Sequence, residues 1–236
     1  MSNALLEYFN KRMGENQTPV SRMKMPGPLI TISREVGCNG VQLAQAIADH
    51  LNLQQQVSNW RVLSKEVFYE SASHLDMEPE RVKRIFRIDS YALNDILTAF
   101  GSKKYKSEKV IIKTVNEVIH SFADEGYCII VGRAAHIIAH DIRNALHLRL
   151  AAPLDYRISS IMKKKNMAKP EAIEFIKKVE RERAAFRKAI RKESLEVECF
   201  DLCINRASFS DRDIIELIDL AAEKKKIFND YVRAEY

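Results

Sequence analysis

The distribution of apolar and polar residues along the chain predicts strands that alternate with helices. Short apolar or β-branched runs bounded by glycine, proline or polar residues indicate strands at Leu29–Ser33, Tyr127–Val131, Leu146–Ala151 and Asp201–Asn205. Apolar residues at three- and four-residue steps predict helices from Val41 to Leu51 and over Ser107–Ala123, Leu154–Lys164, Pro170–Lys192 and Asp211–Tyr231. This alternation predicts an α/β fold, a parallel sheet with helices on both faces.

Two further stretches complete the predicted organisation. A helix over Ala4–Met13 precedes a loop-like segment, so residues 1–27 are expected to form an N-terminal helix and linker, and residues 28–236 one domain. The segment from Val57 to Lys106 is mostly helical and polar in pattern, with no convincing strand. We therefore expect residues 57–106 to be a helical insertion after the first strand and helix.

The composition favours one globular domain in a reducing compartment. The chain has 236 residues, of which 46% are hydrophobic, and no apolar run approaches the ~20 residues that a membrane helix needs. Cys38, Cys128, Cys199 and Cys203 form no C-x-x-C pair, so we expect four free thiols. No metal site is predicted, since the histidines lack metal-ligand spacing, and the pair His136 and His140 is expected on an ordinary helix surface. These features predict a cytoplasmic protein without a membrane segment.

The positive charge is concentrated in one segment. The net charge is +6, yet residues 163–192 contain twelve Lys and Arg against four Glu, so the rest of the chain is −2. One cationic segment suits a small polyanion such as a nucleotide better than a duplex nucleic acid. The alternative is a solvated helix with salt bridges between successive turns.

Within this segment, Arg183 occupies a vacant position in an apolar stripe that includes Val179 and Phe186, and Arg187 lies one turn further on. Both guanidinium groups are therefore expected to face a bound phosphate chain as a lid closes and excludes water. The alternative is that Arg183 extends along the helix and pairs with Glu180 or Glu182.

The turn after the first strand has the features of a phosphate-binding loop. A strand that leads through a glycine-containing turn, Ser33 to Gln42, into a helix gathers backbone N–H groups at the positive end of the helix dipole. The pattern G-x-x-x-x-G-K-[ST] is not satisfied, because neither its Lys nor its Ser or Thr is present. Taken alone, the segment could equally be a tight turn in which Gly37 and Gly40 relieve backbone constraints.

Five segments, in order and spacing, resemble the cytidylate kinase-like family of P-loop nucleoside monophosphate kinases. They are Ile30–Gly40 (ITISREVGCNG), Ile129–Ala135 (IIVGRAA), Ala151–Arg157 (AAPLDYR), Glu180–Phe186 (ERERAAF) and Phe200–Asn205 (FDLCIN). The resemblance extends from about Pro28 to the final helix. It implies a three-layer fold of the P-loop NTPase type, with a parallel sheet, a helical monophosphate-binding insertion over 57–106 and a basic helical lid over 163–196.

The family's ISRE-x-G-x-x-G segment replaces the ordinary P-loop, and the chain departs from the family at several positions. Asn39 stands where the family usually has Gly, Val41 and Gln42 where it often has a charged pair, and Val131 where ordinary cytidylate kinases have Asp before Gly-Arg.

Phosphoryl transfer needs cations and N–H donors around the transferred group, so arginines are the expected catalytic residues. The predicted catalytic residues are Arg181, Arg183 and Arg187. The predicted phosphate- and nucleotide-binding residues are Ser33, Arg34, Glu35, Gly37, Cys38, Asn39, Gly40, Gln42, Arg133 and Arg157. Because Gln42 stands where a hydroxyl usually binds Mg²⁺, we expect the ion to be held mainly through ATP.

The leading hypothesis is a nucleoside monophosphate kinase that uses ATP and Mg²⁺, with CMP or dCMP as the first acceptor to test. A second hypothesis is a nucleotide-binding sensor or scaffold that keeps the kinase fold and has lost turnover; Val41, Gln42 and Val131 favour it. Binding of single-stranded nucleic acid is disfavoured, because the basic segment offers only Phe175 and Phe186 as stacking groups.

Overall fold

The computed structural model describes residues 27–54, 60–64, 119–120, 122–191 and 198–228. The helix predicted over Ala4–Met13, most of the predicted insertion and most of the helix predicted over Ser107–Ala123 lie outside these residues. Within the described part of the chain, no helix is long and apolar enough to cross a membrane.

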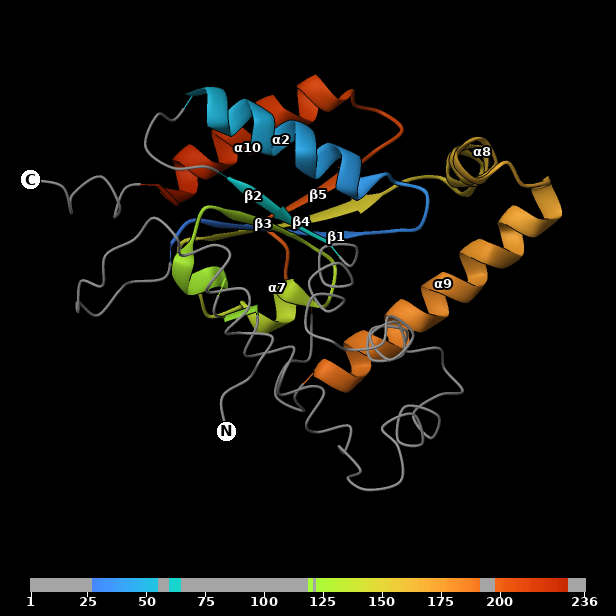
Figure 1. The fold of residues 1–236 in the computed structure, drawn as a ribbon, viewed down its shortest axis with the longest axis horizontal. Helices are drawn as coiled ribbons and strands as arrows, with labels where there is room; N and C mark the ends of the chain where they lie inside the picture. The colour runs from blue at the N-terminus through green and yellow to red at the C-terminus, as the bar shows by residue number, and fades with distance from the viewer. Residues whose placement is uncertain (1–26, 55–59, 65–118, 121, 192–197, 229–236) are drawn as a thin grey trace, which may run out of the picture.

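The centre of the molecule is a parallel five-stranded sheet of order β2-β3-β1-β4-β5. Its strands are β1 (Leu29–Arg34), β2 (Arg61–Leu63), β3 (Cys128–Val131), β4 (Ala145–Ala151) and β5 (Leu202–Asn205). The parallel sheet and its α/β class are as predicted, and β1 lies in the middle. The carboxyl ends of the strands all point toward the side of the molecule where α8 (Leu154–Lys165) and α9 (Lys169–Ile190) lie (Figure 1).

One strand was not predicted. β2 lies inside the stretch from Val57 to Lys106, so the expectation of no strand there is wrong. Three residues are too few to show a two-residue periodicity, which is why the pattern missed it. The strand is preceded by Trp60, which is buried and packs edge-on against the rings of Tyr127 and Phe228. Trp60 is therefore a packing residue.

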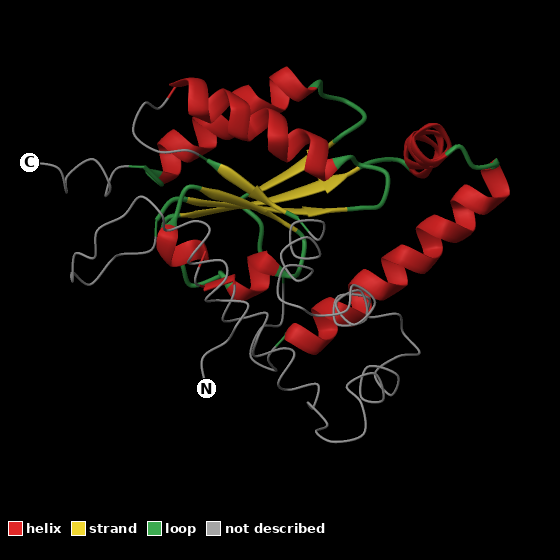
Figure 2. Ribbon diagram, viewed as in Figure 1, coloured by secondary structure: helices red, strands yellow, loops and turns green. Residues whose placement is uncertain are grey.

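Helices cover both faces of the sheet. They are α2 (Gly40–Gln54), α7 (Ala135–Ile138), α8 (Leu154–Lys165), α9 (Lys169–Ile190) and α10 (Asp211–Lys225). α2 and α10 lie on one face and α7 on the other, whereas α8 and α9 extend beyond the carboxyl ends of the strands (Figures 1 and 2). This arrangement confirms the predicted layers.

The largest differences from the predicted helices concern α10 and α7. α10 begins after Ser210, whose hydroxyl accepts a hydrogen bond from the Asp213 amide, and it ends before Lys226, which has a left-handed backbone with φ of 57°. The predicted helix continued to Tyr231, because periodicity alone does not detect a left-handed C-cap. The short α7 was not predicted either.

The main core lies between the sheet and the helices on its faces. Ala44, Ile47, Ala48 and Leu51 of α2 are buried against the strands, as their spacing predicts. Leu43 is buried too, whereas Val41, which belongs to the same predicted stripe, is exposed. A second, smaller cluster consists of Val36, Ile158, Ile161, Ala172 and Ile176. It joins the turn after β1 to the hairpin of α8 and α9.

A buried histidine lies inside this core. The Nδ1 atom of His147 in β4 lies 2.7 Å from the hydroxyl of Thr31 in β1, and the His147 amide donates to the Asp201 carboxylate at 2.7 Å. Burial lowers the pKa of His147 from its usual 6.5 to about 4, in spite of the Asp201 charge. Burial also lowers the pKa of His136.

We expect the free energy of unfolding to fall as the pH decreases from about 6.5 to about 4. In that range the unfolded chain binds more protons than the folded one, so stability rises with pH, by up to about 1.4 kcal/mol per pH unit for each such histidine. Chemical denaturation across this range measures the slope. His147→Gln should make it shallower, whereas a change at exposed His140, His140→Gln, should leave it unaltered. An equal slope in the His147→Gln variant would contradict this interpretation.

Candidate active site

The turn after β1 lies between the ends of the neighbouring strands. The Glu35 amide donates to the Leu150 carbonyl at 2.9 Å, and the Gly132 amide donates to the Ile32 carbonyl at 3.0 Å. The turn is thereby fixed at the carboxyl edge of the sheet, between β3 and β4. In open α/β sheets this edge is where ligands bind.

Two residues give the turn its shape. Gly37 has φ of +98° and Asn39 has φ of 50°. Asparagine tolerates the left-handed region better than most other residues with a side chain. Asn39 can therefore adopt the backbone conformation for which glycine is otherwise preferred. Its side-chain amide donates to the Ser160 hydroxyl in α8 at 3.2 Å.

The first turn of α2 is a potential anion site. Within the described ranges, the amide N–H groups of Gly40, Val41 and Gln42 have no hydrogen-bond acceptor, and this turn contains no acidic residue. Unpaired N–H groups at the positive end of a fifteen-residue helix attract an anion.

Arg34 extends across this region. A methyl group added at Gly40 would lie 3.1 Å from Cγ of Arg34, and one added at Gly132 would collide with its guanidinium group. The Arg34 side chain therefore passes over both glycines, from the start of α2 to the end of β3. Its aliphatic part lies at Gly40 and its guanidinium group at Gly132, so the positive charge lies at the end of β3.

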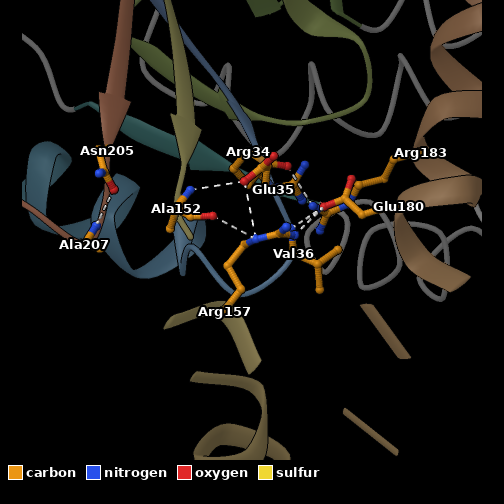
Figure 3. A network of polar contacts seen from close by, with 9 residues as sticks. All are labelled: Arg34, Glu35, Val36, Ala152, Arg157, Glu180, Arg183, Asn205 and Ala207. Carbon is orange, nitrogen blue, oxygen red and sulfur yellow. Dashed lines mark hydrogen bonds and ion pairs between the residues drawn. The ribbon is translucent and has the colours of Figure 1, made fainter. Parts of the chain in front are cut away.

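A chain of charged groups connects the turn with α8 and α9 (Figure 3). The Arg157 Nε atom donates to the Ala152 carbonyl at 3.0 Å and lies 3.4 Å from the Glu35 carboxylate. Its Nη1 atom is 3.7 Å from the Glu180 carboxylate, which accepts a hydrogen bond of 2.6 Å from the Val36 amide. Arg157 is thus engaged by protein groups, and a role in phosphate binding remains a prediction for it.

The arginines of α9 lie in different surroundings. Arg183 faces the turn and donates through Nη1 to the Arg34 carbonyl at 2.8 Å; its burial lowers the pKa of its guanidinium group. Arg187 donates to the Glu198 carboxylate at 3.0 Å. Arg181 is exposed on the same helix, so the structure does not bring it together with the other two.

The outer side of α9 fits the alternative of a solvated helix. Lys177 pairs with Glu174 at 2.9 Å, and Lys178 lies 3.8 Å from Glu182. Both pairs connect neighbouring turns, and all four side chains except the half-buried Glu182 are exposed. The helix therefore has a solvated outer side and an inner side with Arg183 against the turn.

Two more arginines lie near the end of β3 and in β4. Arg133, whose φ is 57°, has its guanidinium group 5.8 Å from the centre of the Phe186 ring of α9. Arg149 donates to the Ser33 hydroxyl at 3.1 Å and lies 6.0 Å from the Phe200 ring. Sequence reasoning missed Arg149, although a lone arginine in the apolar strand sequence ALHLRLA was a signal.

His136 corrects another expectation. It was expected on an ordinary helix surface, but it is buried, stacks on Phe200 with ring centres 4.6 Å apart, and lies 3.3 Å from the Glu198 carboxylate. Its helix packs against the sheet, and a four-residue helix is too short for spacing to reveal which side is buried. Glu198 therefore contacts both Arg187 and His136.

Three predicted ligands differ in what they can offer. The Cys38 side chain is fully buried and burial raises the pKa of its thiol to about 11, so only its backbone can face a ligand. Ser33 is also buried, with its hydroxyl bonded to Arg149. Gln42 is exposed at the first turn of α2.

The four cysteines are free thiols.

The site combines unpaired amides with surrounding arginines and has little acidic charge that is not already paired. Glu35 and Glu180 flank Arg157, and Glu198 pairs with Arg187. In the described portion of the chain, no three His, Cys, Asp or Glu side chains are grouped to hold a metal ion. The arrangement is suited to a polyanion that binds along the carboxyl edge of β1.

Comparison with known proteins agrees with this geometry. Residues 29–208 match the model of the cytidylate kinase-like family. No curated protein matches the chain.

Among solved structures, an uncharacterized protein from Eubacterium ventriosum is 18% identical, with a TM-score of 0.57, over 84% of this chain and 98% of that one. A sugar kinase from Janibacter is 12% identical, with a TM-score of 0.48, over 86% of this chain and 99% of that one. A shikimate kinase from Bacteroides thetaiotaomicron is 15% identical, with a TM-score of 0.44, over 84% of this chain and 95% of that one. At 18% identity, the similarity to the Eubacterium ventriosum protein shows a shared fold alone.

Proposed function

The chain belongs to the cytidylate kinase-like family, and from this premise we propose that it is a nucleoside monophosphate kinase that transfers the terminal phosphoryl group of ATP to CMP or dCMP. The observation that supports the proposal most strongly is the first turn of α2, where unpaired amides of Gly40, Val41 and Gln42 lie beside Arg34. Such donors are fixed before the ligand arrives, so they stabilise phosphate charge without reorganisation.

In this proposal the turn from Ser33 to Gln42 holds the ATP phosphates through its backbone, with Arg34 alongside. Arg183 stabilises the charge on the transferred group, because its half-buried guanidinium has donors beyond the one bonded to the Arg34 carbonyl. Arg187 and Arg133 hold the acceptor phosphate. For Arg187 this requires its ion pair with the Glu198 carboxylate to break.

The protein offers Mg²⁺ one oxygen ligand in the first turn of α2, the exposed side chain of Gln42. This donor fits an ion held mainly by ATP phosphates and water. When bound, Mg²⁺ neutralises phosphate charge.

Free thiols and nucleotide substrates are consistent with a cytoplasmic location.

A nucleotide-binding protein without turnover is the second candidate. Exposed Gln42 and Val41 at the start of α2, and the pairing of Arg187 with Glu198, favour it. It shares the loop and the ATP site with the kinase and differs only in the transfer step.

The test is release of ADP from ATP and Mg²⁺ with CMP, dCMP, UMP, AMP, GMP or no acceptor. We expect turnover that depends on an acceptor and is highest with CMP or dCMP. ATP binding without turnover on any acceptor would favour the second candidate, and turnover with AMP or GMP alone would contradict the proposed substrate.

A further inference from the structure

Val36 attaches the turn after β1 to α8 and α9 in two ways. Its side chain is buried in the small cluster with Ile158 and Ile161 of α8 and Ile176 of α9. Its amide donates to the Glu180 carboxylate of α9 at 2.6 Å, a bond between residues 144 positions apart. The residue is thus held by both α8 and α9.

Glu180 is itself fixed by a closed set of contacts (Figure 3). Its carboxylate lies 3.7 Å from Arg157, and Arg157 lies 3.4 Å from Glu35. The Glu35 carboxylate accepts from the Ala152 amide at 3.1 Å, and the Ala152 carbonyl accepts from Arg157 at 3.0 Å. Since Arg157 lies between the two carboxylates, it offsets the negative charge that Glu180 would otherwise place near phosphates.

Arg183 contacts the same turn from the next turn of α9. It donates to the Arg34 carbonyl at 2.8 Å, two residues before the amide that Glu180 holds. One helix therefore contacts a carbonyl and an amide of one short backbone segment through side chains of opposite charge. Their spacing of three residues places both on the same side of the helix.

We propose that Glu180 is a positioning residue, a latch that fixes α9 to the backbone of the phosphate-binding turn. The latch holds the turn in the shape that binds phosphate and holds Arg183 at its edge. This inference rests on the proposed function, but the bond between Glu180 and Val36 can be tested without any nucleotide. Glu180 acts on the turn and on Arg183, and not on substrate.

The test compares Glu180→Ala with Glu180→Gln and with Glu174→Ala, a control at an exposed carboxylate on the same helix. Gln keeps an acceptor oxygen but loses the charge that Arg157 offsets. Hydrogen exchange of the Val36 amide is measured relative to amides of β1 and β4, which corrects for any global loss of stability. ATP affinity is measured on the same samples by calorimetry.

For Glu180→Ala we expect exchange at Val36 to be at least about 10-fold faster relative to the strands, and ATP affinity to be about 10-fold weaker, because the amide loses a charge-assisted acceptor. Glu180→Gln should restore part of both effects, and Glu174→Ala should show neither. Unchanged relative exchange at Val36 in Glu180→Ala would overturn the latch. If exchange changes as expected while the parent protein binds no ATP, the latch stands and the proposed function fails.

Discussion

Gly37→Ala is expected to abolish ATP binding and to lower the free energy of unfolding by about 2–4 kcal/mol. A methyl group at residue 37 would lie 2.7 Å from the backbone oxygen of Arg157 and 2.8 Å from its Cα atom. The obstacle is the backbone of α8, which cannot rotate away as a side chain can. In addition, φ of +98° is a conformation that alanine rarely adopts. The turn must therefore shift, and with it the amides that would hold phosphate.

Gly40→Ala is the matched control in the same turn. A methyl group there would lie 3.1 Å from Cγ of Arg34, a flexible side chain, and Gly40 has no unusual φ. We expect a loss of ATP affinity of about threefold or less, since a small movement of Arg34 relieves the contact. Calorimetry and denaturant unfolding of both variants measure the difference. Equal effects of the two substitutions would contradict the close approach of α8 to Gly37.

Arg183→Ala is expected to reduce kcat by about 100-fold to 1,000-fold, the range found when one preorganised donor is removed from a transition state. The effect on stability should be small, about 1 kcal/mol, because the folded protein loses one hydrogen bond, to the Arg34 carbonyl. Arg183 combines a half-buried position, a place beside the turn and remaining N–H donors. A large loss of kcat with a small loss of stability would separate a catalytic role from a structural one.

Lys177→Ala is the control for Arg183→Ala. It also removes a positive charge from α9, but Lys177 is exposed and pairs with Glu174 on the outer side of the helix. Its kcat should equal that of the parent protein within about twofold, since exposed ion pairs contribute little. An Arg183→Ala variant with the same kcat as the Lys177→Ala variant would contradict the role of Arg183.

The sequence predicted those parts of the fold in which neighbouring residues determine the structure. β1 and α2 follow from the β-branched run after Pro28 and the apolar stripe from Val41 to Leu51. β2 and α7 escaped detection because three or four residues are too few to show a repeating pattern of apolar positions. The end of α10 was misplaced because Lys226 stops the helix through its backbone conformation, whereas its residue type favours continuation.

Within the site, sequence reasoning indicated the turn and Arg183, since glycines and a charged residue in an apolar stripe are visible along the chain. It did not show which residues meet. The bond from Val36 to Glu180 joins positions 144 residues apart, and only the packing of α9 on the turn creates it. The same applies to Arg149 on Ser33 and to Glu198 between Arg187 and His136. Long-range pairs of charged groups depend on topology, which local patterns do not encode.

Titration of the parent protein with ATP and Mg²⁺ by calorimetry tests the central claim most directly, namely that the turn between β1 and α2 holds nucleotide phosphates. We predict saturable binding of one ATP per chain, weakened by added inorganic triphosphate and lost in Gly37→Ala. Absence of ATP binding by the folded parent protein, or binding that Gly37→Ala leaves intact, would contradict the claim.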